Sequence, residues 1–122
     1  MKSTQAYDDV LLVPQYSDIR SRSEINVRTD LGNGVSIELP IIASPMDTIS
    51  ESQMAVTMGE SGACAVIHRY NTIEEQARLV GAARDSLPNG TIGAAVGVQG
   101  DFLNRASVLR ALGVDFICID VA

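Results

Sequence analysis

The sequence predicts an α/β fold with a parallel sheet, because a strand–turn–helix unit recurs along the chain. Four apolar segments begin near Ile41, Ala65, Ile92 and Phe116, and each of the first three leads into a helix-like stretch. Polar or glycine residues follow each segment. Parallel neighbours need a crossover connection, which the helical stretches supply. We therefore expect four parallel strands and three helices.

The spacing of these units predicts part of a larger architecture. The segments are about 25 residues apart, and eight such steps make a (β/α)8 TIM barrel of about 250 residues. The chain has 122 residues and ends directly after a strand. An uncovered parallel edge would remain there. We therefore expect the N-terminal half of a TIM barrel, completed by a complementary C-terminal half-barrel.

The expected strands are short and rich in small aliphatic residues, as buried parallel strands are. They cover Ile41–Ala43, Ala63–Ile67, Ile92–Val96 and Val114–Ile119.

The expected helices lie between these strands. They cover Glu51–Ser61, Ile73–Ser86 and Phe102–Leu112. Ser50, Thr72 and Asp101 are their predicted N-caps, because short polar side chains can accept a bond from the first free backbone N–H groups.

The first 40 residues are expected to form a lead-in and a β-hairpin, and residues 41–122 the first half of the barrel. Ile25–Val27 and Val35–Leu39 flank Asn33-Gly34, a dipeptide typical of tight hairpin turns. We expect this hairpin to cap one end of the main body. Val10–Val13 is expected to be a short apolar anchor.

Composition excludes several classes of partner. The net charge of −6 argues against a general nucleic-acid surface. No apolar run approaches the ~20 residues of a membrane span, and the first residues lack the apolar core of a signal peptide. We therefore expect a cytoplasmic protein that binds neither nucleic acid nor membrane. One His and two cysteines give no zinc-ligand spacing, so no metal site is expected.

Functional groups of parallel α/β folds gather at the carboxyl ends of the strands. We therefore expect the site in Ser44–Thr48, His68–Asn71, Gly97–Asp101 and Asp120–Ala122. Gly97 and Gly100 superficially suggest a dinucleotide phosphate loop, but the complete glycine pattern is absent.

Five motifs, in order, resemble the IMP dehydrogenase/GMP reductase family. They are YDDVLLVP at Tyr7–Pro14, PIIASPMDT at Pro40–Thr48, AVIHRY at Ala65–Tyr70, GAAVG at Gly93–Gly97 and ICIDVA at Ile117–Ala122. This resemblance spans nearly the whole chain. It implies a TIM barrel, generally a homotetramer, that transfers hydride at C2 of a purine nucleotide held covalently by a Cys.

Three features resemble the reductase branch, which converts GMP to IMP with NADPH. The path from Asn71 to Thr91 lacks the insertion usual in dehydrogenases, Ser21–Ile25 resembles a reductase segment, and Asp120–Ala122 matches one. Ala43–Met46 is closer to some dehydrogenases, which oxidise IMP to XMP with NAD. The resemblance favours GMP reductase over IMP dehydrogenase, and it allows a monovalent cation in the complete enzyme.

The resemblance also assigns site residues. Ser44 and Met46 would lie near the purine nucleotide, and the cofactor would contact Ser21, Arg22, Arg69, Asp120, Val121 and Ala122. Read without the family, these positions are a turn, a solvated charged loop and a helix cap.

No catalytic residue is assigned within this chain. The family's nucleophilic Cys follows the sixth strand, and neither Cys64 nor Cys118 matches it. The chain by itself should be inactive, and a non-enzymatic half-barrel that docks onto other proteins remains an alternative.

Overall fold

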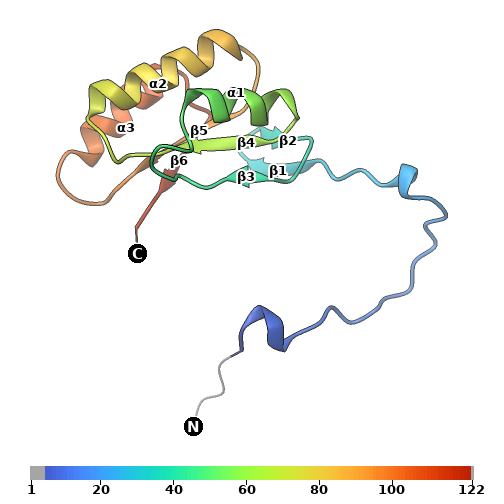
Figure 1. Cartoon of the computed structure of the whole chain (residues 1–122). Coiled ribbons are helices and arrows are strands. Elements are labelled where there is room, and N and C mark those ends of the chain that lie inside the picture. Colours follow the sequence, from blue (N-terminus) through green and yellow to red (C-terminus); the bar gives the residue numbers. More distant parts are fainter. Residues whose placement is uncertain (1–4, 122) are drawn as a thin grey trace.

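The computed structural model describes residues 5–121. Its main sheet has four parallel strands in the order β3-β4-β5-β6, in the chain order that the sequence predicts (Figure 1). The strands are β3 (Ile42–Ala43), β4 (Cys64–Ile67), β5 (Ile92–Val96) and β6 (Phe116–Ile119). Three helices connect them: α1 (Ser52–Glu60), α2 (Ile73–Ser86) and α3 (Phe102–Ala111). The α/β class and the partial TIM-barrel architecture are thereby confirmed.

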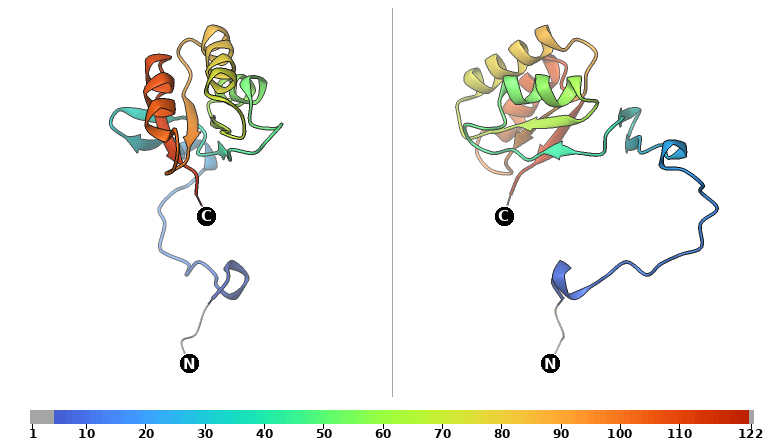
Figure 2. Two further views of the ribbon diagram at one scale, coloured as in Figure 1. Left: turned by 90° about the vertical axis from the view of Figure 1, so that its left-hand side faces the viewer. Right: turned by 45° about the vertical axis from the view of Figure 1, so that its right-hand side comes forward.

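All three helices cover the same face of the sheet (Figures 1 and 2). The core lies between them and includes Ile67, Ile92, Leu79 and Leu109, all at most 3% exposed. Among residues 5–121 no helix covers the other face, where Ile42 is 42% exposed while Cys64 and Val66 on the next strand are at most 3% exposed. This arrangement is that of a barrel wall with its helices outside.

Helix α2 shows how local sequence fixes an element. The Thr72 hydroxyl accepts a bond from the Glu75 N–H at 3.1 Å, which confirms the predicted cap. Leu79, Val80 and Ala83 then recur on one side and are buried against the sheet. The observed bounds are those predicted.

Of the other two predicted caps, Ser50 was wrong, and Asp101 has the predicted position without a side-chain capping bond. The N-cap of α1 is Glu51, without a side-chain bond, because Ser50 is buried and its hydroxyl donates instead to the Ser44 carbonyl. Asp101 occupies the N-cap position of α3 but makes no capping bond. Its carboxylate lies 3.4 Å from the Arg105 guanidinium.

The hairpin forms, but its first strand is shifted. It consists of β1 (Thr29–Gly32) and β2 (Val35–Ile37), so the prediction of a strand at Ile25–Val27 was wrong. Asn33 and Gly34 both have positive φ, 52° and 82°. This two-residue turn pairs the residues directly beside it, which places the first strand closer to the turn.

The hairpin lies at the amino ends of the parallel strands (Figure 1). The Thr91 hydroxyl, just before β5, donates to the Ser36 carbonyl at 3.2 Å. Leu39 N–H donates to the Gly62 carbonyl, just before β4, at 2.8 Å. The hairpin therefore closes one end of the sheet, as predicted, and leaves the carboxyl ends open.

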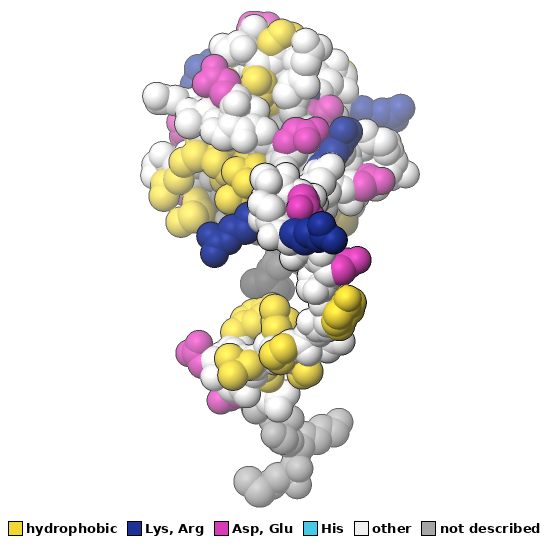
Figure 3. All heavy atoms as spheres, turned by 90° about the vertical axis from the view of Figure 1, so that its right-hand side faces the viewer, with side chains coloured by type: hydrophobic (Ala, Val, Ile, Leu, Met, Phe, Trp, Pro, Cys, Tyr) yellow, Lys and Arg dark blue, Asp and Glu magenta, His cyan; other side chains and the backbone are white. Residues whose placement is uncertain are grey.

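The segment before the hairpin extends away from the body as an arm (Figures 1 and 2). Leu11 and Leu12 on this arm are 94% and 98% exposed, so the expectation that Val10–Val13 anchors the chain was wrong. Figure 3 shows the apolar side chains of the arm lying uncovered beneath the body. Large apolar groups in such a position indicate a surface that a partner covers.

The described residues contain no helix with the length and apolarity that a membrane crossing requires.

A set of hydrogen bonds from Arg84, here called the staple, holds the closed end of the sheet. Arg84 on α2 donates to the Gly90 carbonyl at 2.8 Å and to the Gly113 carbonyl at 2.7 Å. It also donates to Asp115 Oδ2 at 2.7 Å, and that oxygen accepts from the Ile92 N–H at 2.8 Å. One guanidinium thus joins α2 to the starts of β5 and β6.

Replacing Arg84 with Met should lower the free energy of unfolding by about 2 kcal/mol, because a charged hydrogen-bond partner is lost from several acceptors. Urea denaturation measures this change. Arg110→Met on exposed α3 surface is the matched control and should change stability little. Equal losses in both variants would refute the staple.

Candidate functional site

Three side chains meet at the open end of the sheet. Arg69 follows β4 and Asp120 follows β6. The Arg69 Nε donates to Asp120 Oδ2 at 3.2 Å and to the Asp120 carbonyl at 3.1 Å. Tyr70 completes the group, since its hydroxyl donates to Asp120 Oδ2 at 3.3 Å and its ring lies 5.3 Å from the Arg69 guanidinium carbon. We call Arg69, Tyr70 and Asp120 the strand-end cluster.

A hollow of about 280 Å³ lies beside this cluster, lined by Arg69, Gly97, Val98, Gln99 and Val121. A Cβ at Gly97 would lie 3.4 Å from Arg69 Nη1, an ordinary van der Waals contact, so the guanidinium lies close against the backbone at this position. Asp120 offsets the charge of Arg69, and the guanidinium edge retains N–H donors. Such a hollow suits a polar group with oxygen acceptors.

Buried polar groups support the cluster from behind. Gln76 on α2 is fully buried, and its Nε2 donates to the Ile67 carbonyl at 3.2 Å and to the Ala95 carbonyl at 2.9 Å. Arg105 on α3, 7% exposed, donates to Gln76 Oε1 at 2.8 Å and to the Asn71 carbonyl at 2.9 Å. The carboxyl ends of β4 and β5 and the segment after β4 are therefore held from the helical side.

Sequence reasoning missed Gln76 and Arg105 as contributors to this site, and it placed Tyr70 in the predicted segment His68–Asn71 without a role. Gln76 and Arg105 stand among the apolar positions that their helices bury. A polar residue at a buried helix position needs a partner, and that signal could have found them.

The loop after β3 forms a closed series of turns. Met46 N–H donates to the Ser44 carbonyl at 2.8 Å, and the Ile49 and Ser50 N–H groups donate to the Met46 carbonyl at 3.2 and 2.9 Å. Thr48 adopts φ 60°, a left-handed conformation that costs a non-glycine residue about 1 kcal/mol. We call Ser44–Ser50 the β3 loop.

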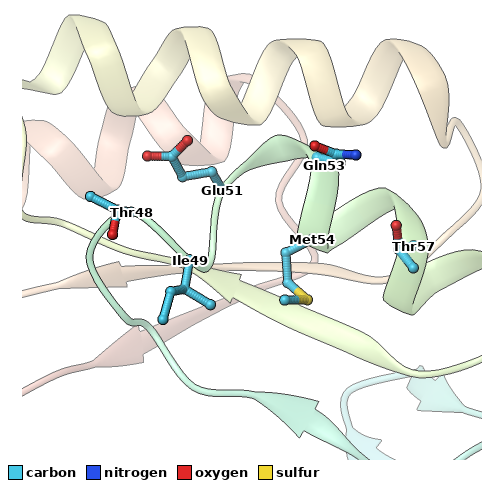
Figure 4. Close-up of a pocket in the computed structure, with 6 residues that line it drawn as sticks. All are labelled: Thr48, Ile49, Glu51, Gln53, Met54 and Thr57. Carbon is cyan, nitrogen blue, oxygen red and sulfur yellow. The ribbon is translucent and has the colours of Figure 1, made fainter.

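The two residues predicted to approach a nucleotide lie on this loop. Ser44 is exposed, and Met46 is 52% exposed. A hollow of about 310 Å³ lies between the loop and the start of α1, lined by Thr48, Ile49, Glu51, Gln53, Met54 and Thr57 (Figure 4). The loop thus presents an adaptable apolar side chain and a hydroxyl at the open end of the sheet.

Of the remaining predicted site residues, Val121 lines the hollow at this end, and the others lie apart from it or outside the described residues. Ser21 and Arg22 are exposed on the arm, where the Ser21 hydroxyl accepts from the Ser23 N–H at 3.3 Å. The arm leaves the body on the hairpin side (Figure 1). Ala122 lies outside the described residues, and its neighbour Val121 is 52% exposed beside the hollow.

Comparison with known proteins identifies the family. The family model described as "IMP dehydrogenase / GMP reductase domain" matches residues 4–122. The chain belongs to the IMP dehydrogenase/GMP reductase family. The resemblance read from its motifs is therefore confirmed.

Relatives from both branches of the family match. The chain is 48% identical over 79 residues to the inosine-5'-monophosphate dehydrogenase of Nitrosopumilus maritimus, covering 65% of this chain and 17% of that protein. It is 47% identical over 74 residues to the GMP reductase of Leishmania donovani, covering 61% and 15%. It is 38% identical over 91 residues to a Staphylococcus saprophyticus inosine-5'-monophosphate dehydrogenase, covering 75% and 18%.

Two facts follow from these matches. The aligned segment spans only 15–18% of the length of these relatives. Identity is nearly equal toward a dehydrogenase and a reductase, at 48% and 47%, so overall similarity does not separate the two branches.

The two thiols of this family member are poorly placed for nucleophilic chemistry. Cys64 is buried in β4, and Cys118 is half-buried in β6. Burial raises the pKa of the Cys64 thiol, with a further rise from nearby Asp115. Burial likewise raises the pKa of the Cys118 thiol, with a smaller contribution from Asp120. Among residues 5–121, no three His, Cys, Asp or Glu side chains converge as metal ligands would.

Both thiols should therefore react slowly with a disulfide reagent at neutral pH, because a raised pKa lowers the thiolate fraction. The reaction rate of each thiol should begin to rise at a higher pH than the rate of free cysteine does. Absorbance of the released thiolate measures this in the native chain and in urea, where both sites should react at least about tenfold faster. Cys118→Ser assigns the two phases, and a thiol that reacts rapidly near pH 6 would contradict the expectation.

Proposed function

We propose that this chain is the N-terminal part of a purine nucleotide oxidoreductase, and specifically of a GMP reductase that converts GMP to IMP with NADPH. Family membership over residues 4–122 carries the proposal. The reductase-like segments at Ser21–Ile25 and Asp120–Ala122 and the short connection between β4 and β5 favour this branch. In this reaction the bond from C2 of the purine to its amino group breaks, hydride from NADPH forms the new C2–H bond, and the amino group takes up a proton and leaves as ammonia.

The hollow beside the strand-end cluster fits a nicotinamide dinucleotide in its chemistry. Arg69 offers N–H donors, Asp120 offers carboxylate acceptors, and Gly97 keeps the backbone accessible. We propose that Arg69, Asp120, Val121 and Ala122 hold the nicotinamide end, and that Ser21 and Arg22 on the arm bind the additional phosphate of NADPH. The bound cofactor would supply the hydride.

Arg69 would orient rather than transfer protons. A guanidinium does not release its proton in proteins, and Asp120 fixes the Arg69 Nε at 3.2 Å. Ser44 and Met46 would contact the purine nucleotide from the β3 loop. This chain would supply no catalytic nucleophile, since burial disfavours the thiolates of Cys64 and Cys118.

The placement of all three described helices on one face of the sheet (Figures 1 and 2) supports a partner that completes the barrel. We propose that residues 41–122 form the first barrel half, that residues 1–40 form the lead-in and hairpin, and that a complementary C-terminal half covers the open face. The complete enzyme would be a cytoplasmic homotetramer, in which the extended arm reaches a neighbouring subunit. A monovalent cation would belong to the complete enzyme rather than to these residues.

IMP dehydrogenase, which oxidises IMP to XMP with NAD, is the second candidate. Its support is the 48% identity to the Nitrosopumilus maritimus dehydrogenase and the Ala43–Met46 segment.

Complementation tests these proposals. The chain is purified alone and with the C-terminal part of the Leishmania donovani GMP reductase, and complexes are sized by chromatography with light scattering. GMP-dependent NADPH oxidation and IMP-dependent NAD reduction are then measured on each fraction. Because the C-terminal part supplies the nucleophile, the same pairing is repeated with the C-terminal part of the Nitrosopumilus maritimus dehydrogenase. Activity with the reductase part alone supports the reductase, and activity with the dehydrogenase part alone supports the dehydrogenase. A soluble monomer that does not bind the C-terminal part supports a non-enzymatic binding module.

Arg22→Ala in the completed enzyme should raise KM for NADPH by about tenfold, because a charged bond to phosphate is worth roughly 1.5–3 kcal/mol. KM for NADH should change less, since NADH lacks that phosphate. Initial-rate kinetics with both cofactors measures the difference. Arg20→Ala, also on the arm, is the control, and equal losses for NADPH and NADH would count against the assignment of Arg22.

A further inference from the structure

His68 lies between the β3 loop and the strand-end cluster. It directly follows β4, its side chain is 2% exposed, and it is the one His of the sequence. Its backbone N–H donates to the Ser50 carbonyl at 3.1 Å. A buried imidazole at this place must satisfy both ring nitrogens from its neighbours.

The Nδ1 side of the ring faces the strand-end cluster. Tyr70 N–H donates to His68 Nδ1 at 3.2 Å. The two rings are stacked, with centroids 6.2 Å apart and an interplanar angle of 20°. An accepting nitrogen carries no hydrogen, so this contact places the proton of the neutral ring on Nε2.

The Nε2 side faces the β3 loop. His68 Nε2 lies 3.4 Å from Glu51 Oε1 and 3.9 Å from Asp47 Oδ1. Glu51 begins α1 directly after the loop, and its carboxylate extends toward Thr48 (Figure 4). The Nε2–H therefore has a carboxylate acceptor at the end of the β3 loop.

We propose that His68 is a positioning residue that couples the two candidate subsites. Through Nε2 it holds Glu51, the N-cap of α1, which joins the β3 loop to that helix. Through Nδ1 it holds the backbone at Tyr70, which with Arg69 contacts Asp120. One ring thereby fixes the nucleotide side relative to the cofactor side. The coupling of contacts is independent of the proposed function, and its kinetic consequence rests on that function.

The tautomer of His68 gives the first test. In tag-free, 15N-labelled chain, every imidazole signal belongs to His68, because the sequence has one His. Long-range 15N–1H spectra at neutral pH should show a hydrogen-bearing Nε2 and an unprotonated Nδ1. A ring protonated at Nδ1, or a rapidly averaged mixture, overturns the proposal.

Two variants separate the two sides of the ring. His68→Asn keeps an acceptor near Nδ1 and loses the donor at Nε2, whereas His68→Gln keeps a donor near Nε2 and loses the acceptor at Nδ1. Amide hydrogen exchange at Ile49 and Ser50 should accelerate about tenfold in His68→Asn, the loss expected for one hydrogen bond, and little in His68→Gln. The Tyr70 amide should show the reverse pattern.

Glu51 supplies the matched control. Glu51→Gln keeps an acceptor and should protect the loop amides as the native chain does, whereas Glu51→Ala should behave like His68→Asn. If amide exchange accelerated equally at the loop amides and at the Tyr70 amide in both His68 variants, the role of His68 would be merely structural and the proposal would be overturned.

Kinetics of the completed enzyme extends the test to function. His68→Asn should raise KM for the nucleotide more than for the dinucleotide, and His68→Gln the reverse. Equal effects on both KM values overturn the coupling. If the exchange pattern holds and the completed enzyme lacks nucleotide activity, the proposed function fails while the positioning role of His68 stands.

Discussion

The open end of the sheet depends on the hydrogen bonds made by the carboxamide of Gln76. The β4–β5 ladder ends where Ile67 pairs with Ala94. Just beyond, one amide nitrogen donates to carbonyls of both strands. Its oxygen accepts a hydrogen bond from the Arg105 guanidinium on α3. An unpaired carbonyl in this buried position would be costly, so the amide lets both strands end in ordered, site-forming segments.

Stability and chemistry are concentrated at opposite ends of the same strands. Arg84 and Asp115 hold the amino ends, where the hairpin also packs. Arg69 and Asp120 meet at the carboxyl ends, beside the hollow. Parallel α/β folds generally separate these roles in this way. The polar residues at the site can therefore vary without loosening the closed end.

The sequence correctly predicted the elements whose bounds are set by interactions between residues close together in the chain. Helix α2 and strand β5 have the predicted bounds, since Thr72 caps the helix and small residues pack the strand. The carboxyl ends of the predicted parallel strands and the family motifs also located Arg69 and Asp120 at one edge. The meeting of these two side chains depends on strands 51 residues apart in sequence, and pairing in register brings them together.

Other features depend on long-range packing that periodicity does not encode. Ser50 has the composition of a helix cap, but burial redirects its hydroxyl to the Ser44 carbonyl. An arginine is normally expected on the surface. Arg105 instead lies in the interior, where it donates hydrogen bonds to Gln76 and Asn71. The arm contacts too little of the body for its own sequence to determine where it lies.

The pairing order β3-β4-β5-β6 has a consequence for synthesis. Each strand pairs with the next one made, across a single helix, so no contact within this sheet waits for a distant segment. Low contact order favours rapid folding, and domains fold from the N-terminus as the ribosome extends them. This wall can therefore assemble early during synthesis, while the apolar side chains of the arm stay exposed. A nascent chain at that stage presents the kind of surface that chaperones bind.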